Sequence, residues 1–236
     1  MRYNLLSLAS LSSAALLMAD GAAAQTPVVV ELFTSEGCSS CPPADALLSA
    51  IRKAAPAEGV EVIALSEHVD YWNQLGWRDP FSSRQFSERQ QEYARRFQIR
   101  GPYTPQMVVD GRWEFVGSDR GRLEGVLREA AAKPKARVEI VRNGAELAIT
   151  VPGAADGEAW MAITEDGLAT AVKRGENGGR TLRHDGVVRK MARLGKGRRF
   201  REAWKPDGTW RGGLRVVVFV TDRNGAVVAA GALGVD

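Results

Sequence analysis

The sequence predicts an α/β domain followed by a mainly β domain. Three observations predict this class. Apolar strand patterns alternate with amphipathic helix patterns as far as Pro134. The only two cysteines, Cys38 and Cys41, fall between the first strand pattern and the first helix pattern. Beyond Pro134, short alternating segments joined by Asn-Gly turns replace the helices.

The N-terminal end of the chain is typical of a signal peptide. Met1 and Arg2 precede an apolar stretch at residues 5–18, and Ala22 to Ala24 offer a small-residue cleavage site. An apolar stretch of this length is too short to span a bilayer comfortably. We therefore predict a signal peptide at residues 1–24, a periplasmic or secreted mature protein, and no permanent membrane anchor.

The net charge of the chain does not favour a dedicated nucleic-acid partner. The net charge is +4 over 236 residues, a mild excess that aids solubility and attracts anionic surfaces only weakly. Export to an oxidising compartment permits a disulfide, and two cysteines permit only one within the chain.

The first elements are expected in the order strand, helix, strand. An unbroken apolar run at residues 28–33 predicts a strand buried on both faces. Apolar residues at helical spacing predict a helix from Ala44 to Ala55. Residues 61–66 form the second strand, which the helix carries back parallel to the first.

A hairpin and a further helix are expected to complete the first domain. Residues 106–110 and 112–116 flank Asp110-Gly111, a dipeptide that suits a type I′ turn. Ser118 is expected to cap the following helix, and Pro134 ends it.

A helical insertion separates the second strand from this hairpin. It covers residues 68–101, opens with aromatic residues, and continues as a helix over residues 83–97 that packs onto the sheet. Trp72 and Trp77 lie in a segment without periodicity, so they are candidates for a substrate surface.

The second domain is predicted to be a small β-sandwich. Its expected strands lie at residues 137–142, 146–151, 160–164, 214–221 and 226–230. The boundary near residues 133–135 gives domains at 25–134 and 135–236. Between these strands, Gly175 to Arg180 and His184 are expected in loops, although the segment around His184 could also fold over the dithiol and complete a cleft. The basic run from Arg189 to Arg201 is expected in a solvated strand edge or loop.

Cys38-Ser39-Ser40-Cys41 is the candidate catalytic site. Unpaired N–H groups and the macrodipole at a helix N-terminus favour a thiolate. Cys38 is therefore expected to be the nucleophile and Cys41 the resolving thiol. Ser39 and Ser40 can donate hydrogen bonds to the sulfur anion, and His68 can tune it by its charge.

Other uses of the two thiols remain open from the residues. A stabilising bridge across so short a loop removes only about 2 kcal/mol of unfolded-state entropy, so a purely structural role is disfavoured. Permanent zinc would need His68 and His184, which lie in different predicted domains. We predict no resident metal or cofactor, although transient Cu(I) binding by the thiols with His68 stays an alternative.

Three motifs resemble the thioredoxin superfamily in order and type. They are Gly37 to Pro42 around the cysteines, Tyr103-Thr104-Pro105, and the hairpin from Met107 to Phe115. The resemblance implies a thioredoxin-like fold for the first domain and a cis Thr104–Pro105 bond facing the dithiol. It also implies a substrate-docking role for Thr104 and Pro105, joined by Tyr103 and Trp72.

The chain is more closely similar to a family of exported proteobacterial thioredoxin-like proteins of unknown function. That likeness rests on residues 31–38, 66–73, 77–83 and 175–188. The chain lacks thioredoxin's Trp before the first cysteine and its Gly-Pro between the two, so no redox potential follows. Glu31 is a candidate for the acidic proton-relay residue.

The sequence thus predicts an exported thiol:disulfide oxidoreductase whose partners are protein thiols and disulfides and an unidentified redox protein. The alternatives are a copper metallochaperone and a non-catalytic partner-binding module. Client proteins, redox direction, the electron donor or acceptor, the role of the second domain and the oligomeric state do not follow from the residues.

Overall fold

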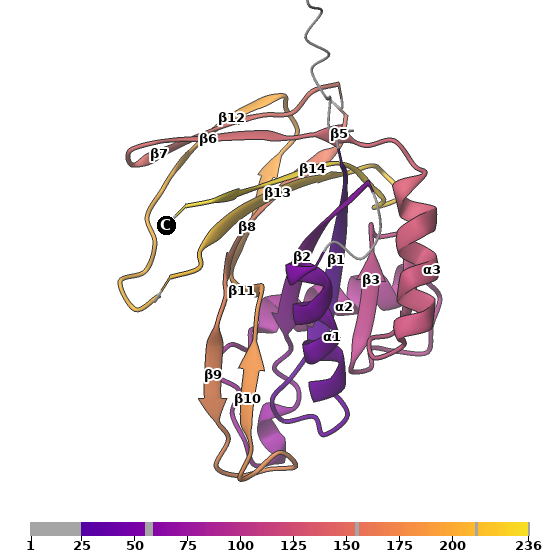
Figure 1. The fold of residues 1–236 in the computed structure, drawn as a ribbon, viewed down its shortest axis with the longest axis vertical. Helices are drawn as coiled ribbons and strands as arrows, with labels where there is room; N and C mark the ends of the chain where they lie inside the picture. Colours follow the sequence, from indigo (N-terminus) through magenta and orange to yellow (C-terminus); the bar gives the residue numbers. More distant parts are fainter. Residues whose placement is uncertain (1–24, 55–58, 154–155, 211, 236) are drawn as a thin grey trace, which may run out of the picture.

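The computed structural model describes residues 25–54, 59–153, 156–210 and 212–235. In these residues the chain forms fourteen strands, three α-helices and one 3-10 helix (Figure 1). The predicted signal peptide lies outside the described residues, as does Ala55 at the end of the first predicted helix. None of the described helices is long and apolar enough to cross a membrane.

The first elements follow the expected order. Strand β1 (Thr26–Thr34) leads through the cysteine motif into helix α1 (Pro42–Lys53), and β2 (Val60–His68) follows. β1 and β2 pair in parallel, with Thr34 opposite His68, so the predicted parallel pair is confirmed. The carboxyl ends of both strands therefore lie beside the start of α1.

The insertion and the hairpin also form near their predicted positions. The 3-10 helix η1 (Asn73–Leu75) precedes α2 (Arg84–Arg96), whose cap Ser83 accepts a hydrogen bond from the N–H of Gln85. Strands β3 (Gln106–Val109) and β4 (Trp113–Val116) flank a turn in which Asp110 and Gly111 have φ values of 48° and 60°. Positive φ at both positions confirms the type I′ turn.

Helix α3 (Arg120–Ala131) begins one residue later than predicted. Asp119, not Ser118, caps it, because the Asp119 carboxylate accepts the N–H of Arg122 at 2.9 Å. The remaining strands are β5 (Ala136–Arg137), β6 (Glu139–Asn143), β7 (Glu146–Thr150), β8 (Glu158–Glu165), β9 (Leu168–Ala171), β10 (Thr181–His184), β11 (Val187–Gly195), β12 (Arg199–Ala203), β13 (Arg215–Thr221) and β14 (Val227–Gly234).

The predicted fold class is wrong. The fold is mostly β, and one mixed nine-stranded sheet runs through both parts of the chain in the order β4-β3-β1-β2-β11-β8-β13-β14-β5. It is therefore not a thioredoxin-like α/β domain with a helical insertion followed by a β-sandwich. The two parts join where Val187 of β11 pairs in parallel with Ser66 of β2, and the Ser66 N–H donates to the Gly186 carbonyl at 2.8 Å.

The sequence pattern could not reveal this join, for a physical reason. An apolar run such as β2 indicates burial on both faces, but it says nothing about which distant strand covers its edge. The pairing depends on β11, which is separated from β2 by more than a hundred residues.

The helices cover both faces of the sheet around β1 and β2 (Figure 1). α1 and α3 bury one face with Val28, Val30 and Leu32, and α2 buries the other with Val29 and Phe33. Because successive strand residues point to opposite faces, this alternation fixes where each β1 side chain lies.

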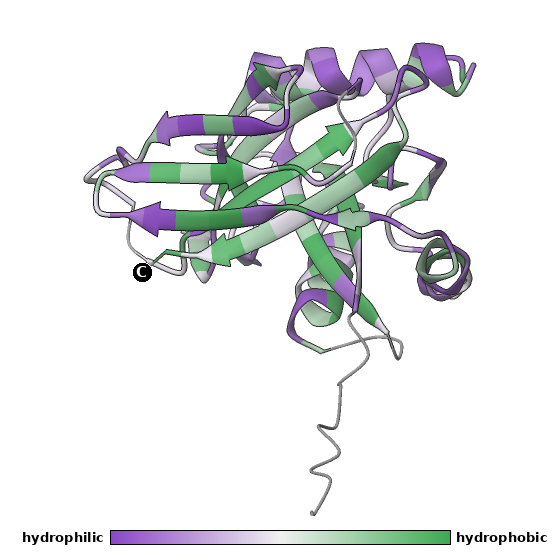
Figure 2. Cartoon of the chain, turned by 90° about the horizontal axis from the view of Figure 1, so that it is seen from above, coloured by the Kyte–Doolittle hydropathy of each residue, from purple (hydrophilic) through white to green (hydrophobic). Residues whose placement is uncertain are grey.

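A three-stranded sheet, β12-β7-β6, packs on the C-terminal strands of the large sheet. Figure 2 shows hydrophobic residues along the strands and hydrophilic residues at the turns and outer helix surfaces. The hairpin β9–β10 leaves the sheet and lies against α1 (Figure 1). This hairpin brings a late segment of the chain to the cysteine motif.

Candidate functional site

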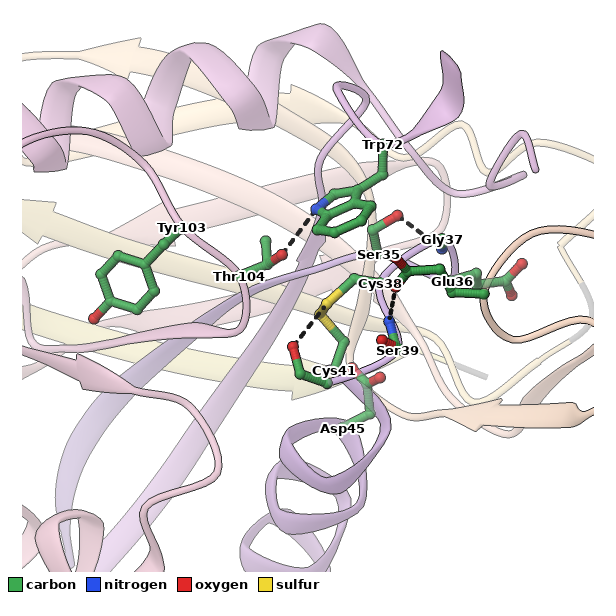
Figure 3. The surroundings of a disulfide bond; sticks show 12 residues. Ser35, Glu36, Gly37, Cys38, Ser39, Cys41, Asp45, Trp72, Tyr103 and Thr104 are labelled. Carbon is green, nitrogen blue, oxygen red and sulfur yellow. Dashed lines mark hydrogen bonds between the residues drawn. A yellow bond between two sulfur atoms is a disulfide. The ribbon is translucent and has the colours of Figure 1, made fainter. Parts of the chain in front are cut away.

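A disulfide joins Cys38 to Cys41 at the start of α1, with their Cα atoms 5.5 Å apart (Figure 3). Cys41 is the N-cap residue, and its carbonyl accepts the N–H groups of Ala44 and Asp45. Pro42 and Pro43 occupy the first two helical positions, where no amide hydrogen is needed. The prolines therefore begin the helix without weakening it.

Both cysteines are fully buried in this disulfide form, whereas the two serines between them are exposed. A nucleophilic Cys38, as predicted from the sequence, needs an accessible sulfur, and the disulfide form does not provide one. The Ser40 hydroxyl lies 3.4 Å from the Cys38 sulfur, close enough to interact with it. The Ser39 N–H is instead taken by the carboxylate of Glu176 at 2.9 Å.

Trp72 and the Thr104–Pro105 peptide lie on the other side of the cysteine motif. The Thr104–Pro105 bond is cis, as expected from the sequence. The Trp72 indole N–H donates to the Thr104 hydroxyl at 2.8 Å, and Figure 3 shows the indole beside the disulfide. A Cβ on Gly37 would lie 3.1 Å from the Trp72 Cβ, so the two segments pack closely.

Two predicted site residues point elsewhere. The Tyr103 ring is turned away from the disulfide, and its hydroxyl donates to Glu114 at 2.7 Å (Figure 3). Glu31 lies on the face of the sheet that α2 covers, where its carboxylate accepts from Arg89 and Tyr93. Strand alternation puts Glu31 on the face opposite α1.

His68 lies at the end of β2 and forms a buried pair with Asp79. Their Nδ1 and Oδ2 atoms are 2.7 Å apart, and neither side chain is exposed. Burial alone would lower the pKa of His68, but the carboxylates of Asp79, Asp45 and Glu36 together raise it above the ordinary value. Burial alone would raise the pKa of Asp79, but His68 and the backbone N–H groups of Glu36 and Phe81 together lower it below the ordinary value. Asp79 also accepts the N–H of Glu36 at 2.8 Å, which ties the pair to the cysteine motif.

His184 is buried against His68 rather than lying in a loop. It ends β10, and the two imidazole ring centres are 4.8 Å apart. His184 Nε2 lies 3.3 Å from Glu36 Oε1, and His184 Nδ1 lies 3.9 Å from Asp45 Oδ2. Burial raises the pKa of Asp45. The disulfide motif thus adjoins a buried group of proton donors and acceptors.

This group is incompletely hydrogen-bonded. Both His184 ring nitrogens lack a hydrogen-bond partner, as do Glu36 Oε1, Asp45 Oδ1 and His68 Nε2. However, no set of three or more His, Cys, Asp and Glu side chains in the described ranges is arranged to hold a metal ion. What this arrangement can do chemically is exchange protons next to a dithiol.

The loop between β9 and β10 closes over the cysteine motif. Asn177 is fully buried, and its side-chain amide donates to the carbonyls of Glu36 and Cys38, each at 2.9 Å. Trp77 also contacts this region, because its indole N–H donates to Glu36 Oε2 at 2.8 Å. The sequence predicted a loop at residues 175–180 but assigned it no role.

Several residues that lie near the disulfide were not predicted from the sequence. Some of them are close to the cysteines in the sequence, and others are not. Glu36 and Asp45 lie two residues before Cys38 and one helical turn after Cys41, so proximity in the sequence could have found them. Glu176 and Asn177 offered no such signal, and for His184 the sequence suggested only, as an alternative, that its segment could fold over the dithiol. Only the fold brings them there, because β10 packs on α1.

The comparison with family models identifies one family. The family model described as "Protein of unknown function (DUF1223)" matches residues 29–221. A crystal structure of a protein from Agrobacterium tumefaciens is similar over 89% of this chain and 94% of its own, with 30% sequence identity and a TM-score of 0.70. No curated protein matches.

A second solved structure has a much weaker likeness. It is an endonuclease/exonuclease/phosphatase from Beutenbergia cavernae, with 18% identity over 42% of this chain and 23% of its own, and a TM-score of 0.20. The family model, by contrast, spans most of the described residues. The chain therefore belongs to the DUF1223 family.

Proposed function

We propose that this protein is an exported thiol:disulfide oxidoreductase that acts on protein thiols and disulfides through Cys38 and Cys41. The observation that carries the proposal is the closed Cys38–Cys41 bridge at the start of α1. A bridge across so short a loop adds little to stability, so a redox role explains it better than a structural one. Only the Cys38–Cys41 motif, and not the fold, supports a comparison with the thioredoxin superfamily.

The reaction is thiol–disulfide exchange. In the reducing direction, the Cys38 thiolate attacks one sulfur of a client disulfide, the client S–S bond breaks, and the other client sulfur leaves as a thiolate. Cys41 then loses its proton and attacks the Cys38 sulfur of the mixed disulfide. The second client thiolate leaves, and Cys38–Cys41 is the oxidised product. Client oxidation is the same sequence reversed.

Access to the sulfur sets a condition on this proposal. Both cysteines are buried in the disulfide form, so exchange needs Trp72 or the β9–β10 loop to move. Thr104, whose hydroxyl now binds Trp72, would then be free to contact a client chain. Ser40, close to the sulfur, can stabilise its anion.

The test compares two single-cysteine variants, Cys41→Ser and Cys38→Ser, treated with oxidised glutathione at neutral pH. We expect Cys41→Ser to form the mixed disulfide at least about tenfold faster, because only Cys38 is the activated thiol. Intact-protein mass spectrometry follows the adduct. Cys41→Ser should also retain client proteins as mixed disulfides in the compartment where the protein works.

Equal and slow reaction of the two variants would contradict the proposal and leave the bridge as a structural one. Tight Cu(I) binding by a reduced protein that does not exchange would point instead to metal transport. The same glutathione buffers give the reduction potential of the wild-type pair, which decides the redox direction.

A further inference from the structure

Two neighbouring side chains of the β9–β10 loop form hydrogen bonds with the cysteine motif, although more than 130 residues separate them from it in the sequence. Asn177 hydrogen-bonds to the backbone of Glu36 and Cys38, and Glu176 hydrogen-bonds to the backbone of Ser39. Together they contact the residue two positions before the first cysteine, that cysteine, and the residue after it.

Asn177 donates hydrogen bonds to the backbone carbonyls of the turn that contains Cys38. Its amide nitrogen donates to two carbonyls at 2.9 Å each, and its Oδ1 accepts from Arg180 Nη1 at 2.8 Å. The side chain is fully buried. Without this amide, the Glu36 and Cys38 carbonyls would lose their shared donor inside the protein, so the turn and the direction of the Cys38 sulfur depend on it.

Glu176 differs from Asn177 because it places a negative charge close to Cys38. Its carboxylate accepts the Ser39 N–H at 2.9 Å, and hydrogen bonds from Ser39 lower the pKa of Glu176. A negative charge is therefore held one residue from Cys38. It also occupies an N–H group near the start of α1 that could otherwise stabilise a Cys38 thiolate.

The loop is held in place by close packing on the aromatic insertion. Gly175 has φ +77°, and a Cβ there would lie 3.1 Å from the Trp77 Cβ. Trp77 in turn hydrogen-bonds Glu36. The loop position is thus fixed by contacts with the segment that precedes Cys38.

We propose that Asn177 and Glu176 are positioning residues for Cys38, with Asn177 orienting the sulfur and Glu176 restraining its ionisation. This inference rests on the proposed function and deepens it. It assigns control of the dithiol to a segment that lies in the later part of the chain.

The first test is Glu176→Gln in the reduced full-length protein, with the exposed Glu124→Gln on α3 as matched control. We expect a lower Cys38 pKa and iodoacetamide alkylation about fivefold faster near neutral pH at low salt, because a charge is removed next to the thiolate. The gain should shrink in about 1 M salt, which screens exposed charges. The reduction potential should shift to a more oxidising value, since the reduced thiolate is stabilised.

The second test is Asn177→Asp, which keeps the shape but replaces the amide donor by a carboxylate. We expect reduction of the disulfide by a phosphine to be about tenfold faster, because the loop no longer holds the turn closed. Asn177→Gln, which keeps the amide, should recover part of the protection. Thermal melts establish that each variant is folded at the temperature of the assay.

The failures of the two proposals differ. An unreactive Cys38 in the wild-type protein overturns the proposed function. A reactive wild-type Cys38, with an alkylation pH profile and a potential that neither Glu176→Gln nor Asn177→Asp changes, overturns the positioning roles alone.

Discussion

At the scale of single residues, the α2 face of the sheet buries two glutamates beside one arginine. Glu31 and Glu67 are fully buried, and Arg89 is the cation between them. Arg89 lies 2.6 Å from Glu31 but 3.6 Å from Glu67. Burial and the neighbouring Glu31 carboxylate raise the pKa of Glu67 well above its ordinary value. We infer that Glu67 keeps its proton to a higher pH than an exposed glutamate does.

This inference predicts a pH dependence of stability. The folded state binds the Glu67 proton more tightly than the unfolded state, so its contribution is full below the ordinary pKa of about 4.3 and is lost as pH rises. Glu67→Gln should remove that loss and raise the free energy of unfolding at pH 8 by about 1 kcal/mol or more. Urea unfolding at pH 5 and pH 8 measures the difference.

The matched control is Glu88→Gln, which removes an exposed carboxylate of α2 that pairs with Arg84. It should change the free energy of unfolding by less than about 0.5 kcal/mol at either pH. If Glu67→Gln were to destabilise the protein equally at both pH values, a buried ionised Glu67 would be the better description.

At the scale of elements, the β3–β4 hairpin is tied to the chain after α3 by a buried ion pair. Lys135 Nζ lies 2.6 Å from Asp110 Oδ2, and both side chains are 2% exposed. The other oxygen of Asp110 accepts the Val29 N–H at 2.9 Å. The turn, β1 and the start of β5 thus share one carboxylate.

Removing the lysine should leave that carboxylate buried and unpaired. We expect Lys135→Ala to lower the free energy of unfolding by about 3 to 5 kcal/mol. The exposed Lys133→Ala should change it by about 0.5 kcal/mol or less. Chemical denaturation at neutral pH compares the two; a loss for Lys135→Ala no larger than the control's would argue against a strong pair.

The elements that the sequence predicted well are those with a clean local pattern. β1, α1, β2 and α2 follow apolar periodicity. β11 does not, because its register shifts between Val188 and Lys190, which breaks the alternation. Its arginines also pack on rings instead of pointing only to water, with Arg193 lying 4.9 Å from the Trp160 ring centre. The first part of the basic run therefore resembled a solvated edge, although β11 is an inner strand. The rest of the run does lie in a loop and in β12, an edge strand with exposed residues, as predicted.

At the scale of the whole molecule, the join between β2 and β11 decides the architecture. Gly186, which precedes β11, has φ +68°, and a Cβ there would lie 3.0 Å from the Ala64 carbonyl oxygen. A side chain at this position would force the two strands apart. Glycine is therefore required here by both conformation and space.

Gly186→Ala tests the join. Gly153→Ala is the matched control, because Gly153 has φ +79° but open space around its missing Cβ. Both variants lose about 1 kcal/mol from the left-handed backbone. Gly186→Ala should lose about 1 kcal/mol more, from the contact with β2. Equal losses in urea unfolding would show that the join tolerates a side chain.

The candidate site also combines residues from short local motifs with residues from segments distant in the sequence. The cysteine pair could be predicted from its own short segment, and the cis Thr104–Pro105 bond from the resemblance of its motif. The place of Asn177 could not be predicted, and that of His184 was only an alternative, because both depend on how β10 packs on α1. The thioredoxin-like fold was inferred from the segment that contains the motifs, and the sheet beyond β2 made that class wrong.

The late arrival of Asn177 has a consequence for how the protein is made. A growing chain emerges N-terminus first, so the two sulfurs leave the synthesis machinery well before the amide that will hold their turn. During that interval an oxidant can reach them without displacing anything. Bridge formation in the nascent chain therefore needs no opening step, whereas reduction of the buried bridge in the folded protein does.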